Sequence, residues 1–188
     1  MSAETHLCML LDSLENLPEN QLPDGYRFAV CTEKTSKDYE TVINYSFGDS
    51  GHDWKNEVQT KVGYHAGNTI LIYYQEIPVA TATALCDERS GQDEGYLHMV
   101  GVLSNHSGKH LGYEVSLRAL HLMFDQGMKT CKLDTNDFRL PAIITYLKLG
   151  FKPVYLNDDH IMRWKKVLKK LNLERYKFTN MFNEEKDN

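Results

Sequence analysis

Apolar residues fall into short blocks separated by polar stretches, and the spacing inside these blocks changes along the chain. In one kind of block, β-branched and aromatic residues follow one another or alternate with polar residues, which is typical of strands. Turn-forming residues flank several of these blocks. The pattern predicts strands at residues 25–32, 69–75, 78–86, 95–103, 129–134 and 151–156, with a last strand at 160–164.

Other blocks repeat their apolar residues every three or four positions, which is the period of a helix. This spacing predicts helices over residues 35–49, 108–126 and 138–149, and the last two are followed by Gly127 and Gly150. Trp54, Val58 and Val62 predict a short second helix after residue 51. Residues 5–17 are apolar with interspersed acidic residues, and we expect an amphipathic helix there.

The resulting order of elements predicts an α/β protein with one mixed sheet of six to seven strands and helices on both faces. The early hairpins indicate an antiparallel part. The run from residue 95 to residue 156 alternates strand, helix, strand, helix, strand, which indicates parallel neighbouring strands joined by right-handed crossovers.

Composition narrows the class of protein. The chain has 188 residues, which corresponds to one domain, and its net charge of −5 disfavours a broad nucleic-acid surface. The four cysteines are too widely spaced for a metal clip, so we expect reduced thiols in a cytoplasmic protein. No apolar run is long enough to span a membrane, and we expect no membrane partner.

The most informative stretch is residues 100–113, VGVLSNHSGKHLGY, where a predicted strand enters a glycine-containing loop and then a helix. The first turn of a helix has unpaired backbone amides and a partial positive charge, so such a loop can hold a diphosphate. Lys109 adds a cation. Gly108 and Gly112 are equally consistent with a helix cap and a packing contact.

Gly101 lies inside an otherwise strong strand, which indicates a β-bulge or a close approach of another backbone. A bulge splays a strand from its neighbour and leaves backbone groups that can bind an extended ligand rich in amides. The pantetheine arm of coenzyme A is a ligand of this kind.

Two motifs resemble the GNAT superfamily of N-acetyltransferases. The loop SGKHLG, residues 107–112, is similar to the family's RGKGIG, with Ser107 in place of Arg or Gln and His110 in place of Gly. The family's second motif, Asn-x-x-Ala-x-x-x-Tyr-x-Lys-x-Gly-Phe, is matched in one register. The matching residues are Ala142, Tyr146, Lys148, Gly150 and Phe151, with Arg139 where Asn is common.

The resemblance implies a single GNAT-like domain over residues 1–188, with strands splayed at an acetyl-CoA site and no metal. Residues 1–22 form an N-terminal extension, 23–93 the half that shapes the acceptor site, 94–164 the acetyl-CoA-binding half and 165–188 a charged tail. A homodimer is common in such a family. The implied cofactor-binding residues are Val100, Gly101, Val102, Ser107, Gly108, Lys109, His110, Leu111, Gly112, Tyr113, Asn136, Arg139 and Tyr146. For Asn136 a turn cap, and for Arg139 a surface ion pair, are alternatives.

The resemblance also implies catalytic roles. Tyr146 matches the tyrosine that protonates the departing sulfur, although a core aromatic residue fits the same pattern. His98 lies on the strand that supplies a base in this family, and its neutral-range pKa suits that role, with Glu94 in reserve. Alternation along the strand puts Tyr96, His98, Val100 and Val102 on one face.

The function implied is transfer of an acetyl group from acetyl-CoA to a primary amine of a small molecule or peptide, by direct attack in a ternary complex. Two alternatives stay open: a coenzyme A-binding module or sensor without turnover, and an acyltransferase using another acyl donor. Asp49, Asp53 and Glu57 with Trp54 indicate either an acidic pocket for a cationic amine or a solvated helix face.

Overall fold

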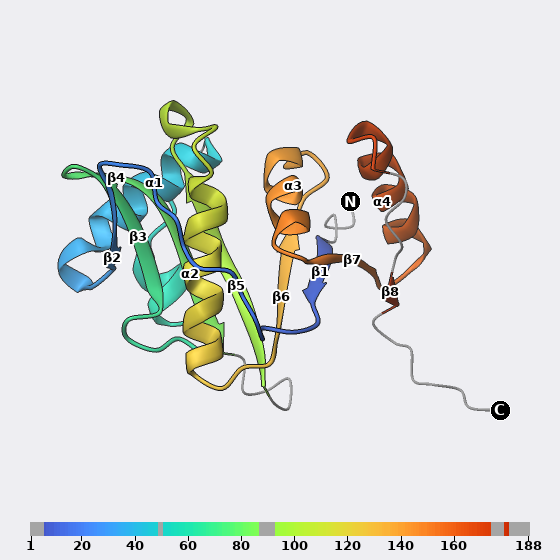
Figure 1. Ribbon diagram of the computed structural model, residues 1–188, viewed down its shortest axis with the longest axis horizontal. Coiled ribbons are helices and arrows are strands. Elements are labelled where there is room, and N and C mark those ends of the chain that lie inside the picture. The colour runs from blue at the N-terminus through green and yellow to red at the C-terminus, as the bar shows by residue number, and fades with distance from the viewer. Residues whose placement is uncertain (1–5, 49–50, 87–92, 174–178, 181–188) are drawn as a thin grey trace. The chain divides into compact units, whose positions relative to one another are not determined.

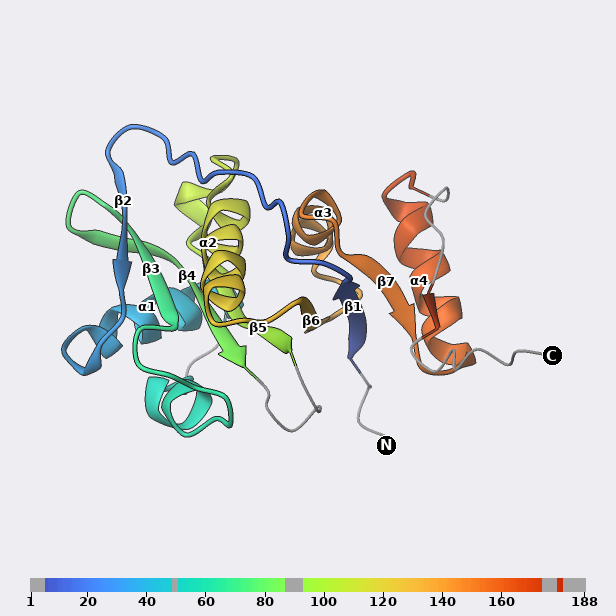
Figure 2. The same ribbon diagram turned by 60° about the horizontal axis from the view of Figure 1, so that its bottom comes forward.

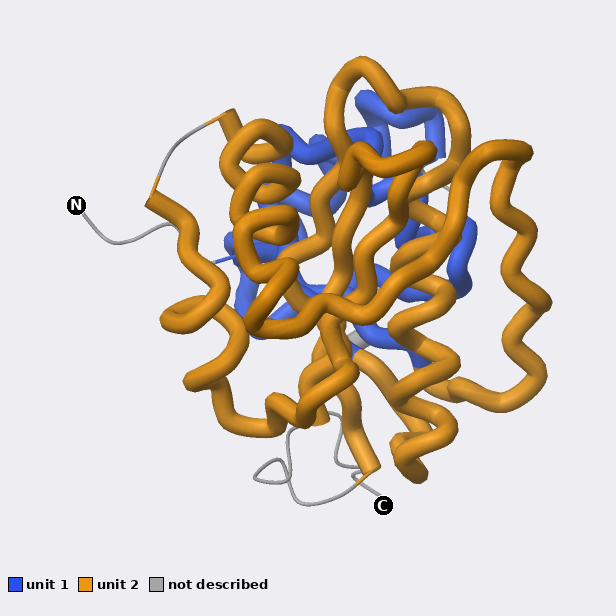
Figure 3. The backbone as a smooth tube through the Cα atoms, turned by 90° about the vertical axis from the view of Figure 1, so that its left-hand side faces the viewer, with its two compact units in different colours: residues 1–11, 132–188 blue, residues 12–131 orange. Residues whose placement is uncertain are grey.

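The chain folds into two units, coloured separately in Figure 3. The larger unit comprises residues 12–131, and the smaller unit comprises residues 1–11 together with residues 132–188. The computed structural model describes residues 6–48, 51–86, 93–173 and 179–180. Much of the charged tail expected at residues 165–188 lies outside these ranges.

The larger unit contains four antiparallel strands in the order β2-β3-β4-β5 (Figure 1). They span Tyr26–Val30, Thr69–Tyr74, Ile77–Cys86 and Glu94–Val102. The hairpin between β3 and β4 turns at Gln75, whose φ of 54° is the left-handed backbone that tight hairpin turns require. These strands confirm the antiparallel part that the sequence predicts.

Helices α1 (Ser36–Phe47) and α2 (Leu111–Asp125) cover opposite faces of these strands (Figure 2). A Cβ atom added at Gly101 of β5 would lie 3.0 Å from Ile43 of α1, and one added at Gly95 would lie 2.5 Å from Met123 of α2. Glycine at these two positions therefore lets both helices approach the strand closely. Short helical turns η1 (Glu33–Thr35), η2 (Lys55–Gln59) and η4 (Ser104–His106) complete the unit.

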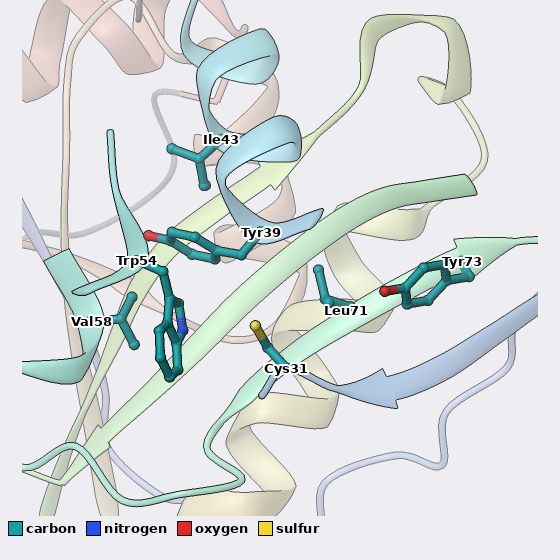
Figure 4. Packing of buried hydrophobic residues seen from close by; sticks show 7 residues of the cluster. All are labelled: Cys31, Tyr39, Ile43, Trp54, Val58, Leu71 and Tyr73. Carbon is teal, nitrogen blue, oxygen red and sulfur yellow. The ribbon is translucent and has the colours of Figure 1, made fainter. Parts of the chain in front are cut away.

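The layer between α1, η2 and the sheet is an apolar cluster. Figure 4 shows its buried residues, which are Cys31, Tyr39, Ile43, Trp54, Val58, Leu71 and Tyr73. Val62 lies outside this layer and is 47% exposed, so the helical stripe expected from residue 54 to residue 62 ends at Val58. The turn itself has π geometry, with the amide of Thr60 donating to the carbonyl of Lys55 at 2.9 Å.

A β-bulge interrupts β5 two residues before Gly101. Thr81 of β4 pairs with Gly101 but Thr83 pairs with His98, so β5 carries one extra residue, and Met99 has a φ of 49°. The bulge reverses the alternation of faces. His98 points towards η2 whereas Val102 contacts the position of Gly112 in α2, so the prediction that His98 and Val102 share a face is wrong.

The smaller unit holds strand β1 (Leu7–Leu11) between β6 (Thr130–Thr135) and β7 (Lys152–Tyr155), with β8 (Thr179–Asn180) at the edge. Strand β6 begins in the larger unit and continues into this one. β1 is antiparallel to β7, and β8 is parallel to it. Helices α3 (Leu140–Lys148) and α4 (Asp158–Lys170) belong to the same unit.

Three sequence predictions are wrong in this unit. Residues 7–11 form a strand rather than a helix: their backbone pairs with β7, and alternate side chains are buried. That strand separates β6 from β7, which are therefore not neighbours. Residues 158–170 form a helix rather than a strand at 160–164. Asn157 caps it by accepting from the amide of His160, and the buried residues His160, Trp164, Val167 and Leu168 follow a helical period.

Candidate active site

The glycine-containing loop leads from β5 into the first turn of α2, as the sequence predicts. The first backbone bond of the helix runs from the amide of Glu114 to the carbonyl of His110 at 3.0 Å. The amides of Leu111, Gly112 and Tyr113 therefore have no acceptor within the helix. Lys109 is exposed beside them. This arrangement offers amide donors, a helix dipole and one cation to an anionic group.

In the loop of residues 107–112, backbone conformation explains the residue at position 108 but not the residue at position 110. Gly108 has a φ of 77° with no atom within 4 Å of an added Cβ, so glycine is used there for its backbone freedom. His110 has a φ of 60°, the left-handed region that disfavours residues with a Cβ. The similar GNAT motif has glycine at the position of His110. The left-handed backbone is the physical reason for glycine at that position.

An aromatic contact that the sequence did not indicate anchors the start of this loop. Nδ1 of His106 lies 2.8 Å from the hydroxyl of Tyr26, and the His106 ring also packs against Tyr74 with centroids 5.5 Å apart. Because 80 residues separate Tyr26 from His106, no local pattern reveals the contact. It ties η4 to strands β2 and β3.

His98, the predicted base, is hydrogen-bonded within the larger unit. Its Nε2 lies 2.8 Å from the carbonyl oxygen of Glu57. A carbonyl only accepts, so Nε2 carries a proton, and in the neutral ring the basic nitrogen is then Nδ1. The ring of Tyr96 packs beside it with centroids 5.8 Å apart.

Glu94, the reserve base, begins β5 four residues before His98. A strand rises about 3.3 Å per residue, so roughly 13 Å separates the two positions. One amine cannot contact both side chains. Only one of the two residues, His98 or Glu94, can therefore be the base for a given amine.

Glu57 of η2 is placed by contacts that the sequence spacing only hinted at. Its Oε1 lies 2.5 Å from Nδ1 of His52. The backbone of His52 is held to α1 by two hydrogen bonds with the side-chain amide of Asn44, at 3.0 and 3.1 Å. Asp53, in contrast, caps the turn by accepting from Asn56, and Asp49 lies outside the described residues.

In the smaller unit, Tyr146 lies on α3 and is buried, 7% exposed, with its ring 6.0 Å from that of Phe151. Asn136 follows β6, its carbonyl accepts from the amide of Arg139 at 2.9 Å, and its side chain accepts from His6 at 3.0 Å. The backbone of Asn136 thus forms a turn with Arg139, whereas its side chain bonds to His6. Arg139 begins α3, with its guanidinium 5.8 Å from the ring centroid of Phe138.

Cys8 of β1 is the one cysteine in the sequence of this unit. Its Sγ donates to Asp134 at 3.1 Å, and burial together with the Asp134 carboxylate raises the pKa of the thiol to about 12. Such a thiol stays protonated at neutral pH and is a poor nucleophile. Among the residues that the structure describes, no group of three or more His, Cys, Asp and Glu side chains is arranged to hold a metal ion. In the same residues no helix has the length and apolar character needed to cross a bilayer.

Residues 31–151, which include the glycine loop, the bulged strand and the Tyr146 motif, match the family model described as the acetyltransferase (GNAT) family. The chain belongs to the GNAT family. The match covers more than half of the sequence and both motifs on which the resemblance rested. The predicted fold class, a mixed α/β sheet with helices, is confirmed with it.

Solved structures of GNAT proteins have the same fold. A GCN5-related N-acetyltransferase from Sphaerobacter thermophilus is 15% identical, with a TM-score of 0.65 over 78% of this chain and 47% of its own. One from Kribbella flavida is 18% identical, with a TM-score of 0.57 over 79% of this chain and 54% of its own. This chain thus spans about half the length of these two structures. Among curated proteins, no sequence matches it.

A third similar structure is Arabidopsis thaliana Naa50, solved in complex with the bisubstrate analogue CoA-Ac-MVNAL. It is 22% identical to this chain, with a TM-score of 0.54 over 68% of this chain and 83% of its own. At sequence identities this low, the similarity shows that these proteins share a fold.

Proposed function

We propose that this protein transfers the acetyl group of acetyl-CoA to a primary amine of a small molecule or of a peptide N-terminus. The observation that carries the proposal is the glycine loop of a GNAT family member, with three helix-start amides that lack an intrahelical acceptor. Naa50, a structural neighbour in complex with a coenzyme A–peptide conjugate, supports peptides among the acceptors to be tested.

The loop residues suit the diphosphate of coenzyme A. The amides of Leu111, Gly112 and Tyr113 would bind its oxygens, with Ser107, Gly108, Lys109 and His110 at the rim. A Cβ at Gly112 would lie 3.5 Å from Val102, an ordinary van der Waals contact, so α2 starts close against β5. Val100, Gly101 and Val102 follow the bulge and would offer backbone groups to the pantetheine arm. Asn136, Arg139 and Tyr146 are proposed as further cofactor contacts.

Acetyl-CoA supplies an activated acyl group as a thioester. In the proposed reaction the amine nitrogen forms a bond to the acyl carbon, the carbon–sulfur bond breaks, and one proton leaves the amine while one reaches the sulfur. A protonated alkylamine has no lone pair to attack with, so a base is needed. We assign that base to Nδ1 of His98 and the proton donor for the sulfur to Tyr146.

A coenzyme A-binding module without turnover is the second candidate. Ser107 and the strained His110 favour it, because they replace the family's Arg or Gln and its glycine. An acyltransferase with another acyl donor is the third. A cytoplasmic location and a homodimer stay predictions.

The experiment incubates the protein with acetyl-CoA and a panel of spermidine, tyramine, glycinamide and the peptide MVNAL, and measures released thiol. We expect turnover of at least one amine, a kcat at least 10-fold lower in Tyr146→Phe, and loss of the pH dependence assigned to the base in His98→Gln. Thermal shift with coenzyme A provides the control, since both variants should still bind it. Binding without thiol release would identify a sensor, and no binding would refute the proposal.

A further inference from the structure

Three buried oxygen atoms without a hydrogen-bond partner lie in the layer between α1, η2 and β5. They are the hydroxyls of Tyr39 and Ser46 and Oε2 of Glu57. Leaving a buried polar atom unpaired costs about 1–3 kcal/mol, so native proteins rarely keep several of them in one layer. These three atoms need an explanation.

Their placement follows the bulged strand. Tyr39 and Ser46 are seven residues apart on α1 and therefore share one face of the helix. The Ser46 hydroxyl is 3.1 Å from a Cβ built at Gly101, just beyond the bulge. The hydroxyl of Tyr39 points towards the turn that carries Trp54 and Val58, which is η2 (Figure 4).

Glu57 belongs to that same turn and lies near Tyr39. Burial, and next the charge of Glu57, raise the pKa of the Tyr39 hydroxyl, although the two side chains form no hydrogen bond with each other. An unpaired hydroxyl and an unpaired carboxylate oxygen therefore face a common region without satisfying each other.

The Glu57 carboxylate is held in place by hydrogen bonds. His52 occupies Oε1 at 2.5 Å, and Nε2 of His98 donates to the Glu57 backbone at 2.8 Å. His52 is in turn fixed by Asn44 and by the edge of its ring against Phe47, with centroids 5.3 Å apart. Oε2 is thus presented by a rigid framework. Single turns with π geometry are frequent at functional sites.

We propose that Glu57 is the counter-ion of the acceptor's amino group, with the hydroxyls of Tyr39 and Ser46 as additional hydrogen-bond acceptors, so that the site selects cationic primary amines. The proposal rests on the proposed function. A primary ammonium has three N–H donors and one positive charge, whereas a carboxylate only accepts and a hydroxyl oxygen can accept. An anionic ligand would be repelled by Glu57.

The test compares Glu57→Gln with Glu76→Gln, which makes the same change of charge at a residue whose side chain is 90% exposed in the β3–β4 turn. Steady-state kinetics use acetyl-CoA and whichever of spermidine, tyramine, glycinamide and MVNAL the wild type acetylates best. We expect the KM for the amine to rise at least 30-fold in Glu57→Gln, with the KM for acetyl-CoA unchanged within 2-fold. Glu76→Gln should behave as the wild type.

A second pair of variants keeps the inference testable if Glu57→Gln fails to fold. Tyr39→Phe and Ser46→Ala each remove one acceptor without changing charge, and each should raise the KM for the amine about 3- to 10-fold with kcat little changed. An unchanged amine KM in Glu57→Gln, or in both hydroxyl variants, overturns the inference and indicates that these oxygens bind an internal water only. A wild type that acetylates none of the amines refutes the proposed function itself.

Discussion

His110 has left-handed backbone at a position where the family motif has glycine, and this strain is the clearest single-residue feature of the glycine loop. An L-residue in this region costs about 1–2 kcal/mol, and glycine loses about 0.5–1 kcal/mol more backbone entropy on folding. We therefore expect His110→Gly to raise the free energy of unfolding by about 0.5–1 kcal/mol, as measured by urea titration.

The matched control is Gly108→Ala two residues earlier. Its φ is 77° and an added Cβ would meet no neighbouring atom, so only backbone strain opposes the change. We expect a loss of about 0.5–1 kcal/mol, because the lower entropy of the unfolded alanine chain offsets part of the strain. If both variants shifted stability in the same direction, left-handed backbone strain would not be what determines the effect of these substitutions.

Residue-scale features were predictable from the sequence where their cause is local. The loop from Ser107 to Gly112 could be predicted because its glycines and the start of the helix are adjacent in the sequence. The contact between Tyr26 and His106 and the unpaired hydroxyl of Tyr39 depend on tertiary packing, and no local spacing encodes them. Glu57 lies between these cases, since its helical position was visible but its inward orientation was not.

At the scale of elements, an ion pair links α4 to the segment between β6 and α3. The guanidinium of Arg163 donates from Nε to both carboxylate oxygens of Asp137, at 3.1 and 3.0 Å, and from Nη2 as well. The Arg163 side chain therefore holds the pKa of Asp137 below its usual value. Arg163 itself is largely buried, with 14% of its side chain exposed.

Replacing Asp137 by Asn should cost about 1–2 kcal/mol at pH 7, less than a fully buried pair because the carboxylate is partly exposed. A carboxyl with a lowered pKa stabilises the fold above its unfolded pKa of about 4, and this contribution is lost as pH falls through the lowered value. Urea unfolding from pH 7 to pH 3 should therefore show the difference between variant and wild type shrinking only below about pH 4. Asp159→Asn is the control, because its contact with Arg163 is longer, at 3.5 Å, and more exposed. A constant difference across this range would contradict the assignment.

Elements with strong periods were predicted correctly, such as α1, α2 and the β3–β4 hairpin. Two elements were assigned the wrong type, β1 and α4. β1 is a five-residue run without a charged residue, which fits either period, and α4 has 13 residues, of which the predicted strand covered only 160–164. In β1 the pairing with β7 decided for a strand. In α4 the decisive features were the Asn157 cap, the acidic first turn and the lysines in the last turn, which together favour a helix.

At the scale of the whole molecule, the smaller unit is assembled from both ends of the chain. β1 comes from the first residues, whereas β6, β7, α3 and α4 come from the last third. The larger unit is one continuous segment with its own apolar layers. The sequence predicted an N-terminal extension lying on the domain, and nothing local in the chain indicates that these residues form a strand inside the sheet of a distant segment.

Removal of residues 1–11 should therefore act on one unit. Leu7 and Met9 are fully buried and Leu11 nearly so, and three such side chains contribute roughly 5–9 kcal/mol by area burial, comparable with the total stability of a domain. In the truncated protein we expect hydrogen exchange to accelerate in peptides from 132–171, while peptides from β3 and β4 keep their protection. Since β1 contributes no strand to the larger unit, equal loss of protection in both sets of peptides would mean that the two units do not unfold separately.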